Sequence, residues 1–184
     1  MATSDNPKLS TTENATKESA DRKIALVVGI NNSKASSSLE TLRYAEEDAY
    51  EIYRVLRQDA CRFTSLDPVL IGDKAGTGHI RSAIIRLVAE RTEQDFLLFY
   101  FIGHAQPMKT MDGQSDIYFV TYDFNPNEIK VDPSAHLSMS WLRKILYQPS
   151  GPGKVLIILD CCYAGNMIEI RPDPGRLHID INVN

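Results

Sequence analysis

Hydrophobic positions along the chain form short uninterrupted runs, separated by stretches in which apolar residues recur with helical spacing. Uninterrupted apolar runs are typical of parallel strands buried on both faces. Such runs predict central strands at residues 23–30, 95–102 and 155–159, and shorter strands at 68–71 and 117–121. Helical spacing predicts helices at 42–56, with Thr41 as its cap, at 77–92, and from Ser138 or Ser140 to Leu146.

Strands that alternate with helices indicate an α/β fold. We therefore expect a three-layer α-β-α sandwich with a mostly parallel central sheet, over residues 23–166. Residues 1–22 are polar and predict a disordered tail, whereas 167–184 are rich in proline and charge and predict a linker. The segments 106–114 and 122–136 contain prolines and polar residues, and are interpreted as loops.

Reactive side chains follow two of the predicted central strands. The strand at 155–159 ends in Asp160-Cys161-Cys162, and the strand at 95–102 ends in Gly103-His104. Since binding sites in open α/β sheets lie at the carboxyl ends of strands, a thiol and an imidazole are expected there together. Alone, each residue would be an ordinary buried cysteine or capping histidine. Together they predict a thiolate nucleophile with a general base.

Composition limits the partners and the compartment. A net charge of −4 and a pI near 5.6 give no electrostatic reason to expect nucleic acid or a membrane as partner. The longest apolar runs are too short to span a bilayer, and no apolar stretch follows Met1. Three cysteines, two of them adjacent, form no disulfide framework, so a cytoplasmic location is expected.

Several other chemistries are disfavoured by spacing. The four histidines show no metal-ligand spacing, and the glycine-rich segment 72–78 lacks the Lys-Ser/Thr of a phosphate loop. The Cys-x5-Arg pattern of cysteine phosphatases is missing, because Met167 and Ile168 stand at the two arginine positions. We expect no metal and no cofactor, with Ca²⁺ in the acidic loops as the one candidate.

The chain resembles the caspase-like cysteine peptidases. Tyr100-Phe101-Ile102-Gly103-His104 is similar to their strand-Gly-His element. The segment 160–165, Asp-Cys-Cys-Tyr-Ala-Gly, is similar to the D-x-C-x-S-G element of the metacaspase and orthocaspase branch. The strand at 25–31 and the helix start at 42–49 also resemble family elements, so the resemblance covers residues 23 to about 166.

The resemblance implies a cysteine endopeptidase that cleaves proteins or peptides after Arg or Lys. Cys162 aligns with the nucleophile and His104 with the base, and the backbone N–H groups of Gly103 and Cys162 would form the oxyanion hole. Asp160 would receive the basic side chain, with Asp123 and Asp48 as weaker candidates for the same pocket. An alternative interpretation of Asp123 is a loop cap.

Two departures from the family pattern favour a second hypothesis. Ala105 stands where glycine usually follows the histidine, and the family domain continues past the cysteine into a small subunit, of which residues 167–184 are either the truncated start or only a linker. Arg43 lies one position from a pocket arginine of Asp-cutting caspases, which leaves acidic specificity open. The alternative is a non-catalytic caspase-like regulatory or scaffold module that needs a small subunit or another caspase-like chain as partner.

Overall fold

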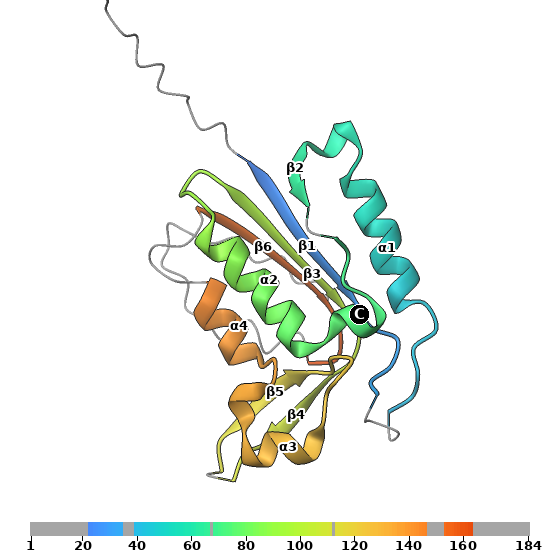
Figure 1. Ribbon diagram of the computed structural model, residues 1–184, viewed down its shortest axis with the longest axis vertical. Helices are drawn as coiled ribbons and strands as arrows, with labels where there is room; N and C mark the ends of the chain where they lie inside the picture. The colour runs from blue at the N-terminus through green and yellow to red at the C-terminus, as the bar shows by residue number, and fades with distance from the viewer. Residues whose placement is uncertain (1–21, 35–38, 67, 112, 147–152, 164–184) are drawn as a thin grey trace, which may run out of the picture.

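The computed structural model describes residues 22–34, 39–66, 68–111, 113–146 and 153–163. Four parallel strands form the central sheet (Figure 1) in the order β2-β1-β3-β6. Their bounds are Phe63–Leu66 (β2), Lys23–Gly29 (β1), Phe96–Ile102 (β3) and Lys154–Asp160 (β6). The predicted central strands β1 and β3 lie in the middle of this sheet, and both are almost entirely buried.

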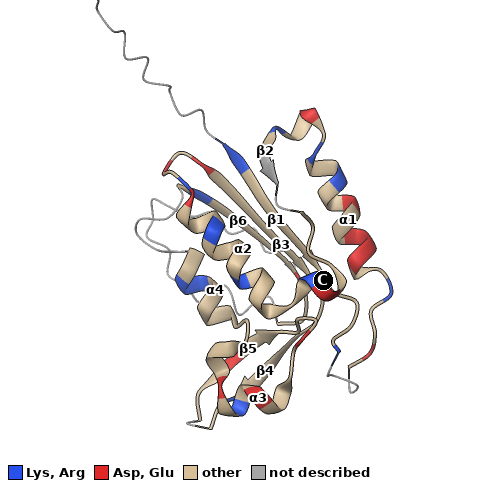
Figure 2. Ribbon diagram, in the orientation of Figure 1, with Lys and Arg blue, Asp and Glu red and all other residues tan. Residues whose placement is uncertain are grey.

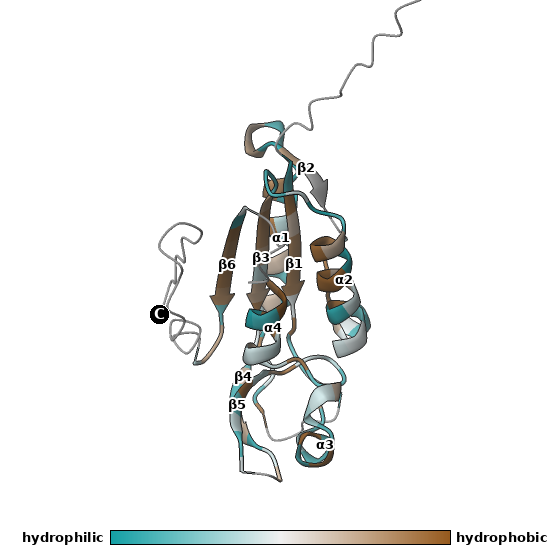
Figure 3. Cartoon of the chain, turned by 90° about the vertical axis from the view of Figure 1, so that its left-hand side faces the viewer, coloured by the Kyte–Doolittle hydropathy of each residue, from teal (hydrophilic) through white to brown (hydrophobic). Residues whose placement is uncertain are grey.

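Helices cover both faces of the sheet. Helix α1 (Ala45–Leu56) packs with Val27, Tyr100 and Ile102 on one face. Helices α2 (Thr77–Ala89) and α4 (Met139–Leu146) pack on the other face, which carries the larger core around Leu26, Phe99 and Ile157. Figure 3 shows β6, β3 and β1 side by side and largely in the brown of hydrophobic residues. The three-layer α/β sandwich with a parallel sheet is therefore confirmed.

A small antiparallel unit lies beyond the carboxyl ends of the parallel strands (Figure 1). It contains β4 (Ala105–Lys109), β5 (Ser115–Phe119) and the short helix α3 (Pro126–Val131). Its core is formed by Tyr118, Val120, Phe124 and Ile129. Three short 3₁₀ turns complete the described elements: Asp59–Cys61, Gly72–Ala75 and Pro133–Ala135.

Both predicted loops contain regular structure, and these two predictions were wrong. Residues 105–109 form β4 despite Pro107, because β4 pairs only with β5 among the described strands, so the missing N–H can face away from the ladder. Residues 126–131 form α3, which starts with Asn125 as cap and Pro126 in the first turn. The Asn-Pro pair was the available signal for that helix.

The second strand and the start of α1 also differ from the prediction. Strand β2 spans Phe63–Leu66, whereas the predicted strand at 68–71 contributes one bridge, between Leu70 and Val28. Helix α1 begins at Ala45, and Thr41 does not cap it. Instead Glu46 N–H donates to Asn31 Oδ1 at 3.2 Å, and Asn31 N–H donates to Glu46 Oε1 at 3.3 Å. This reciprocal pair ties α1 to the loop after β1.

The strand before the cysteines is not the fully buried central strand that its sequence predicts. In the described sheet, β6 pairs with β3 alone and forms an edge. Val155, Ile157 and Leu159 are buried, while Leu156 and Ile158 on the opposite face are only half-buried. The uninterrupted apolar run therefore corresponds, among the described residues, to a strand with one buried face and one half-buried face.

Two remaining expectations concern the ends of the chain and membranes. The predicted tail, apart from Arg22, and the linker at 167–184 lie outside the described residues. None of the described helices has the length and apolar character needed to cross a membrane.

Candidate active site

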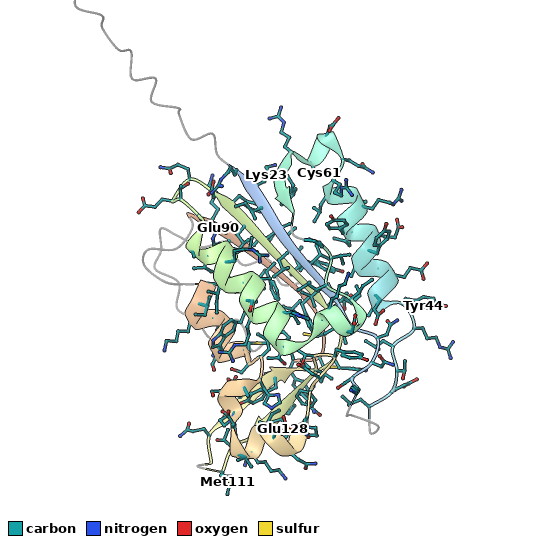
Figure 4. All side chains as sticks on the ribbon, in the orientation of Figure 1. Lys23, Tyr44, Cys61, Glu90, Met111 and Glu128 are labelled. Carbon is teal, nitrogen blue, oxygen red and sulfur yellow. The ribbon has the colours of Figure 1, made fainter. Side chains whose placement is uncertain are left out.

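The carboxyl ends of β3 and β6 bring the predicted reactive residues together. Ile102 and Asp160 are paired in register, so His104 and Cys162, each two residues further on, leave the sheet side by side. Both line one open pocket of about 420 Å³, together with Asp160. Its opposite wall is the start of α1, where Tyr44 and Asp48 contribute (Figure 4 labels Tyr44).

The ring of His104 is oriented by a backbone carbonyl. His104 Nε2 lies 2.7 Å from the carbonyl oxygen of Glu40. Because a carbonyl oxygen only accepts hydrogen bonds, Nε2 must carry the proton in this arrangement. The neutral imidazole then keeps its lone pair on Nδ1, which is the nitrogen that can accept a proton from a thiol.

The two adjacent cysteines occupy different environments. Cys162 is exposed in the turn after β6, whereas Cys161 packs against the core. Burial first, and then the neighbouring Cys162 and Asp160, raise the pKa of the Cys161 thiol to about 12. Cys161 therefore stays protonated at neutral pH and is a poor nucleophile. Tyr163, next in the chain, has a φ of 64°, the left-handed conformation that turns the backbone sharply after Cys162.

Asp160 at the end of β6 and Asp48 on α1 line the same pocket. Both carboxylates are exposed and line it. Between them the pKa of the Tyr100 phenol is raised, first by burial and then by the negative charges of Asp160 and Asp48. Figure 2 shows the acidic residues at the first turn of α1, to which Asp48 belongs. Arg43 is the one basic side chain that also lines this wall among the described residues.

Asp123 is placed elsewhere and serves the fold. Its Oδ1 accepts hydrogen bonds from the Thr77 N–H at 2.8 Å, the Thr77 hydroxyl at 3.0 Å and the Thr121 hydroxyl at 2.9 Å. These donors hold the pKa of Asp123 below its usual value despite partial burial. The carboxylate thus satisfies one of the free N–H groups at the start of α2, and the structure does not bring it into the pocket with Cys162.

The backbone N–H of Gly103, next to His104, is already hydrogen-bonded within the sheet. The Gly103 N–H donates to the Asp160 carbonyl oxygen at 3.2 Å, which extends the ladder between β3 and β6 by one bond. In this arrangement that N–H does not point to a substrate, so service in an oxyanion hole would require the bond to open. Ala105 is buried as the first residue of β4, so its methyl group is accommodated by the fold.

Sequence reasoning missed the Glu40 carbonyl that holds His104. A backbone acceptor has no side-chain signature, so its role depends on where the loop lies in space. No group of three or more His, Cys, Asp and Glu side chains is arranged to hold a metal ion within the described ranges.

Comparison with known proteins places this arrangement in a family. A family model described as the caspase domain matches residues 22–178, which is most of the chain. Among solved structures, protein GSU0716 from Geobacter sulfurreducens is similar, with a TM-score of 0.61 and 18% sequence identity. The alignment covers 77% of this chain and 50% of that one, so the chain spans about half the length of this structural neighbour. No curated protein matches significantly.

At 18% identity the structural neighbour supports the fold alone. The family model, in contrast, matches both strand ends that carry the histidine and the cysteines. On that match, over more than half of its length, the chain belongs to the caspase-domain family of cysteine peptidases.

Proposed function

We propose that the chain is a cysteine endopeptidase in which Cys162 is the nucleophile and His104 the general base. The observation that carries the proposal is the single pocket lined by His104, Asp160 and Cys162. The exposure of Cys162, compared with the partly buried and protonated Cys161, supports the choice between the two thiols. The carbonyl of Glu40 supports His104 by holding the tautomer with a free Nδ1.

The reaction divides into acylation and deacylation. His104 accepts the thiol proton of Cys162, and the thiolate sulfur attacks the peptide carbonyl carbon to form a tetrahedral adduct. When the carbon–nitrogen bond breaks, His104 donates that proton to the leaving amine. Water then gives a proton to His104 and adds to the thioester, which releases the carboxylic acid and restores the thiol.

The charges of the pocket support cleavage after Arg or Lys. Asp160 and Asp48 converge on one region, and a basic side chain between them would be paired in a partly desolvated site. Arg43 sits at the exposed rim and reduces the net negative charge to one. We therefore propose that a basic residue precedes the scissile bond, and that Asp160 makes the larger contribution because it adjoins Cys162.

The decisive experiment compares the two adjacent cysteines on a fluorogenic peptide that ends in an arginine amide. Cys162→Ala should abolish cleavage, since Cys161, the other thiol that lines the pocket, stays protonated at neutral pH. Cys161→Ala is the matched control and should keep most of the activity, because its thiol packs against the core. Equal loss from both substitutions, with both proteins folded by circular dichroism, would contradict the assignment.

A second candidate is a non-catalytic caspase-like module that pairs with a partner chain. One observation favours it: the Gly103 N–H already donates to the carbonyl oxygen of Asp160 and is not available to an oxyanion. Selective alkylation separates the candidates. Iodoacetamide at pH 8 should label Cys162 well before Cys161, whose pKa of about 12 leaves roughly one thiolate in ten thousand. Failure of both labelling and cleavage, also with a small-subunit chain added, supports the module.

A further inference from the structure

A second pocket adjoins His104 on the side away from Asp160. Its volume is about 190 Å³, and it lies between the loop after β1 and the segment that contains Glu40 and Thr41. Of the described residues that line the two pockets, His104 is the one they share. The imidazole and the Glu40 carbonyl that holds it thus separate two concave sites.

We propose that this second pocket binds the side chain of the residue that follows the scissile bond, and that it selects uncharged polar or basic side chains over acidic ones. The inference rests on the proposed peptidase function. It follows from the position of the base: the leaving amine must receive its proton from His104, so the leaving residue has to pass next to the imidazole. Asp160 lines the pocket that contains Cys162 and does not line this one, which leaves this pocket for the leaving residue.

Some residues that line the pocket are held by hydrogen bonds, whereas others expose their polar groups. Asn31 is bonded to Glu46, and the Ser33 hydroxyl donates to the carbonyls of Tyr122 at 3.2 Å and Phe124 at 3.1 Å. These bonds hold the wall of the pocket in place. Asn32 and Thr41 are exposed, so their amide and hydroxyl are accessible to an incoming side chain.

Charge sets the expected selectivity. Glu40 is exposed and is the only acidic or strongly basic side chain among the described residues that line this pocket. An aspartate or glutamate entering it would meet a like charge, whereas a lysine would meet an opposite one. The volume has room for roughly six water molecules, which suits a side chain of moderate size such as Ser, Asn or Lys.

The test uses internally quenched peptides that share arginine before the scissile bond and differ only after it. We expect the wild-type protein to cleave peptides with Ser or Lys there roughly fivefold faster than peptides with Asp. Glu40→Gln should remove most of this preference. Glu47→Gln is the matched control, because Glu47 is an exposed carboxylate of α1 outside both pockets. Equal cleavage of Ser and Asp peptides, or an equal effect of Glu47→Gln, would overturn the inference.

Two further measurements separate this inference from the proposed function. A peptide that ends in an arginine coumarylamide has no residue after the bond, so its cleavage reports on the peptidase alone. Binding of the same peptide series to Cys162→Ala, measured by fluorescence anisotropy, reports on the pocket without turnover. If the coumarylamide is cleaved but binding and cleavage ignore the following residue, only the pocket assignment is wrong. If no peptide is cleaved or bound, both proposals are wrong.

Discussion

The two ends of the parallel sheet hold their carboxylates in opposite ways. At the amino ends, Asp95 is fully buried, and its oxygens accept from the Arg22 guanidinium at 2.5 and 3.1 Å and from the Thr92 N–H at 2.9 Å. At the carboxyl ends, Asp160 and Asp48 are exposed and line a pocket. The first carboxylate is saturated with partners from its own chain and can only stabilise the fold. The other two keep their charge available for a ligand.

The way the strands pair at each end of the sheet accounts for part of this difference. Asp95 and Arg22 directly precede β3 and β1, which are paired in register from Lys23 and Phe96 onward, so their side chains meet. At the other end the strands diverge into separate loops, and the side chains that follow them surround open space. The predictions below test this contrast between a paired end and an open end, from the largest expected effect to the smallest.

His104→Ala should cause the largest change and should affect activity alone. Loss of a general base costs typically 10²- to 10⁴-fold in rate. We expect a fall of roughly that size in kcat/KM for the arginine amide peptide. The unfolding free energy in urea should stay nearly unchanged, because His104 is half-buried at the edge of the pocket. A large loss of stability would show that the open end also supports the fold.

Asp95→Asn should show the reverse pattern. The substitution removes the buried negative charge that pairs with Arg22 and attracts Arg91. The buried guanidinium of Arg91 has no hydrogen-bond partner among the described residues. Breaking a buried ion pair costs about 3–5 kcal/mol, and we expect about 2 kcal/mol here since Arg22 is 40% exposed. Urea unfolding measures the loss. The selectivity between Arg and neutral peptides should not change; a shift in it would contradict the separation of the two ends.

Asp160→Asn should lower kcat/KM for the arginine peptide by roughly tenfold, about 1.4 kcal/mol of transition-state binding. Asp48→Asn should have a smaller effect of the same sign, because Asp48 lies on the opposite wall from Cys162. Asp123→Asn is the matched control: it should leave selectivity unchanged and lower stability, since its carboxylate caps α2. If Asp123→Asn changed selectivity without lowering stability, Asp123 would instead belong to the substrate pocket.

Acid should destabilise the paired end at a definable pH. Hydrogen bonds from Arg22 hold the pKa of Asp95 far below its usual value near 4. A lowered folded-state pKa gives stability that is complete above about pH 5 and is lost as the pH falls below it. The unfolding free energy of the wild type should therefore fall more steeply than that of Asp95→Asn below pH 5. Parallel curves in that range would rule out the ion pair as the cause.

A second, smaller acid effect is expected at higher pH. Burial lowers the pKa of His136, which packs edge-on against Phe124, although Glu128, Asp123 and Asp132 partly oppose the shift. The unfolded chain then binds the proton more readily, so stability falls as the pH drops below about 6.5. His136→Gln should flatten the unfolding free energy between pH 6.5 and 5 without altering the steeper loss below it.

Local patterns predicted those parts of the fold that depend on few partners. The apolar runs located β1, β3 and β6, and helical spacing located α1, α2 and α4 to within a few residues. The cysteine and histidine could be found because each directly follows one of these strands. Strands β2 and β4 and helix α3 were missed, since short elements in polar segments are decided by the neighbours against which they pack.

The sequence by itself determined the three-layer α/β architecture and the placement of His104 and Cys162 at one edge of the sheet, because parallel strands end at the same edge. The pairing of β3 with β6, which makes the two residues neighbours, belongs to the tertiary structure. Only the tertiary structure decided which acids join them. Asp48 enters the pocket because the Asn31–Glu46 bonds fix the start of α1 above it, and Asp123 turns away to cap α2. The tertiary structure also supplied the Glu40 carbonyl that orients His104. Such contacts form between segments that are far apart in the sequence. The packing of the whole domain sets the distance between these segments, so a local sequence pattern does not predict the contacts.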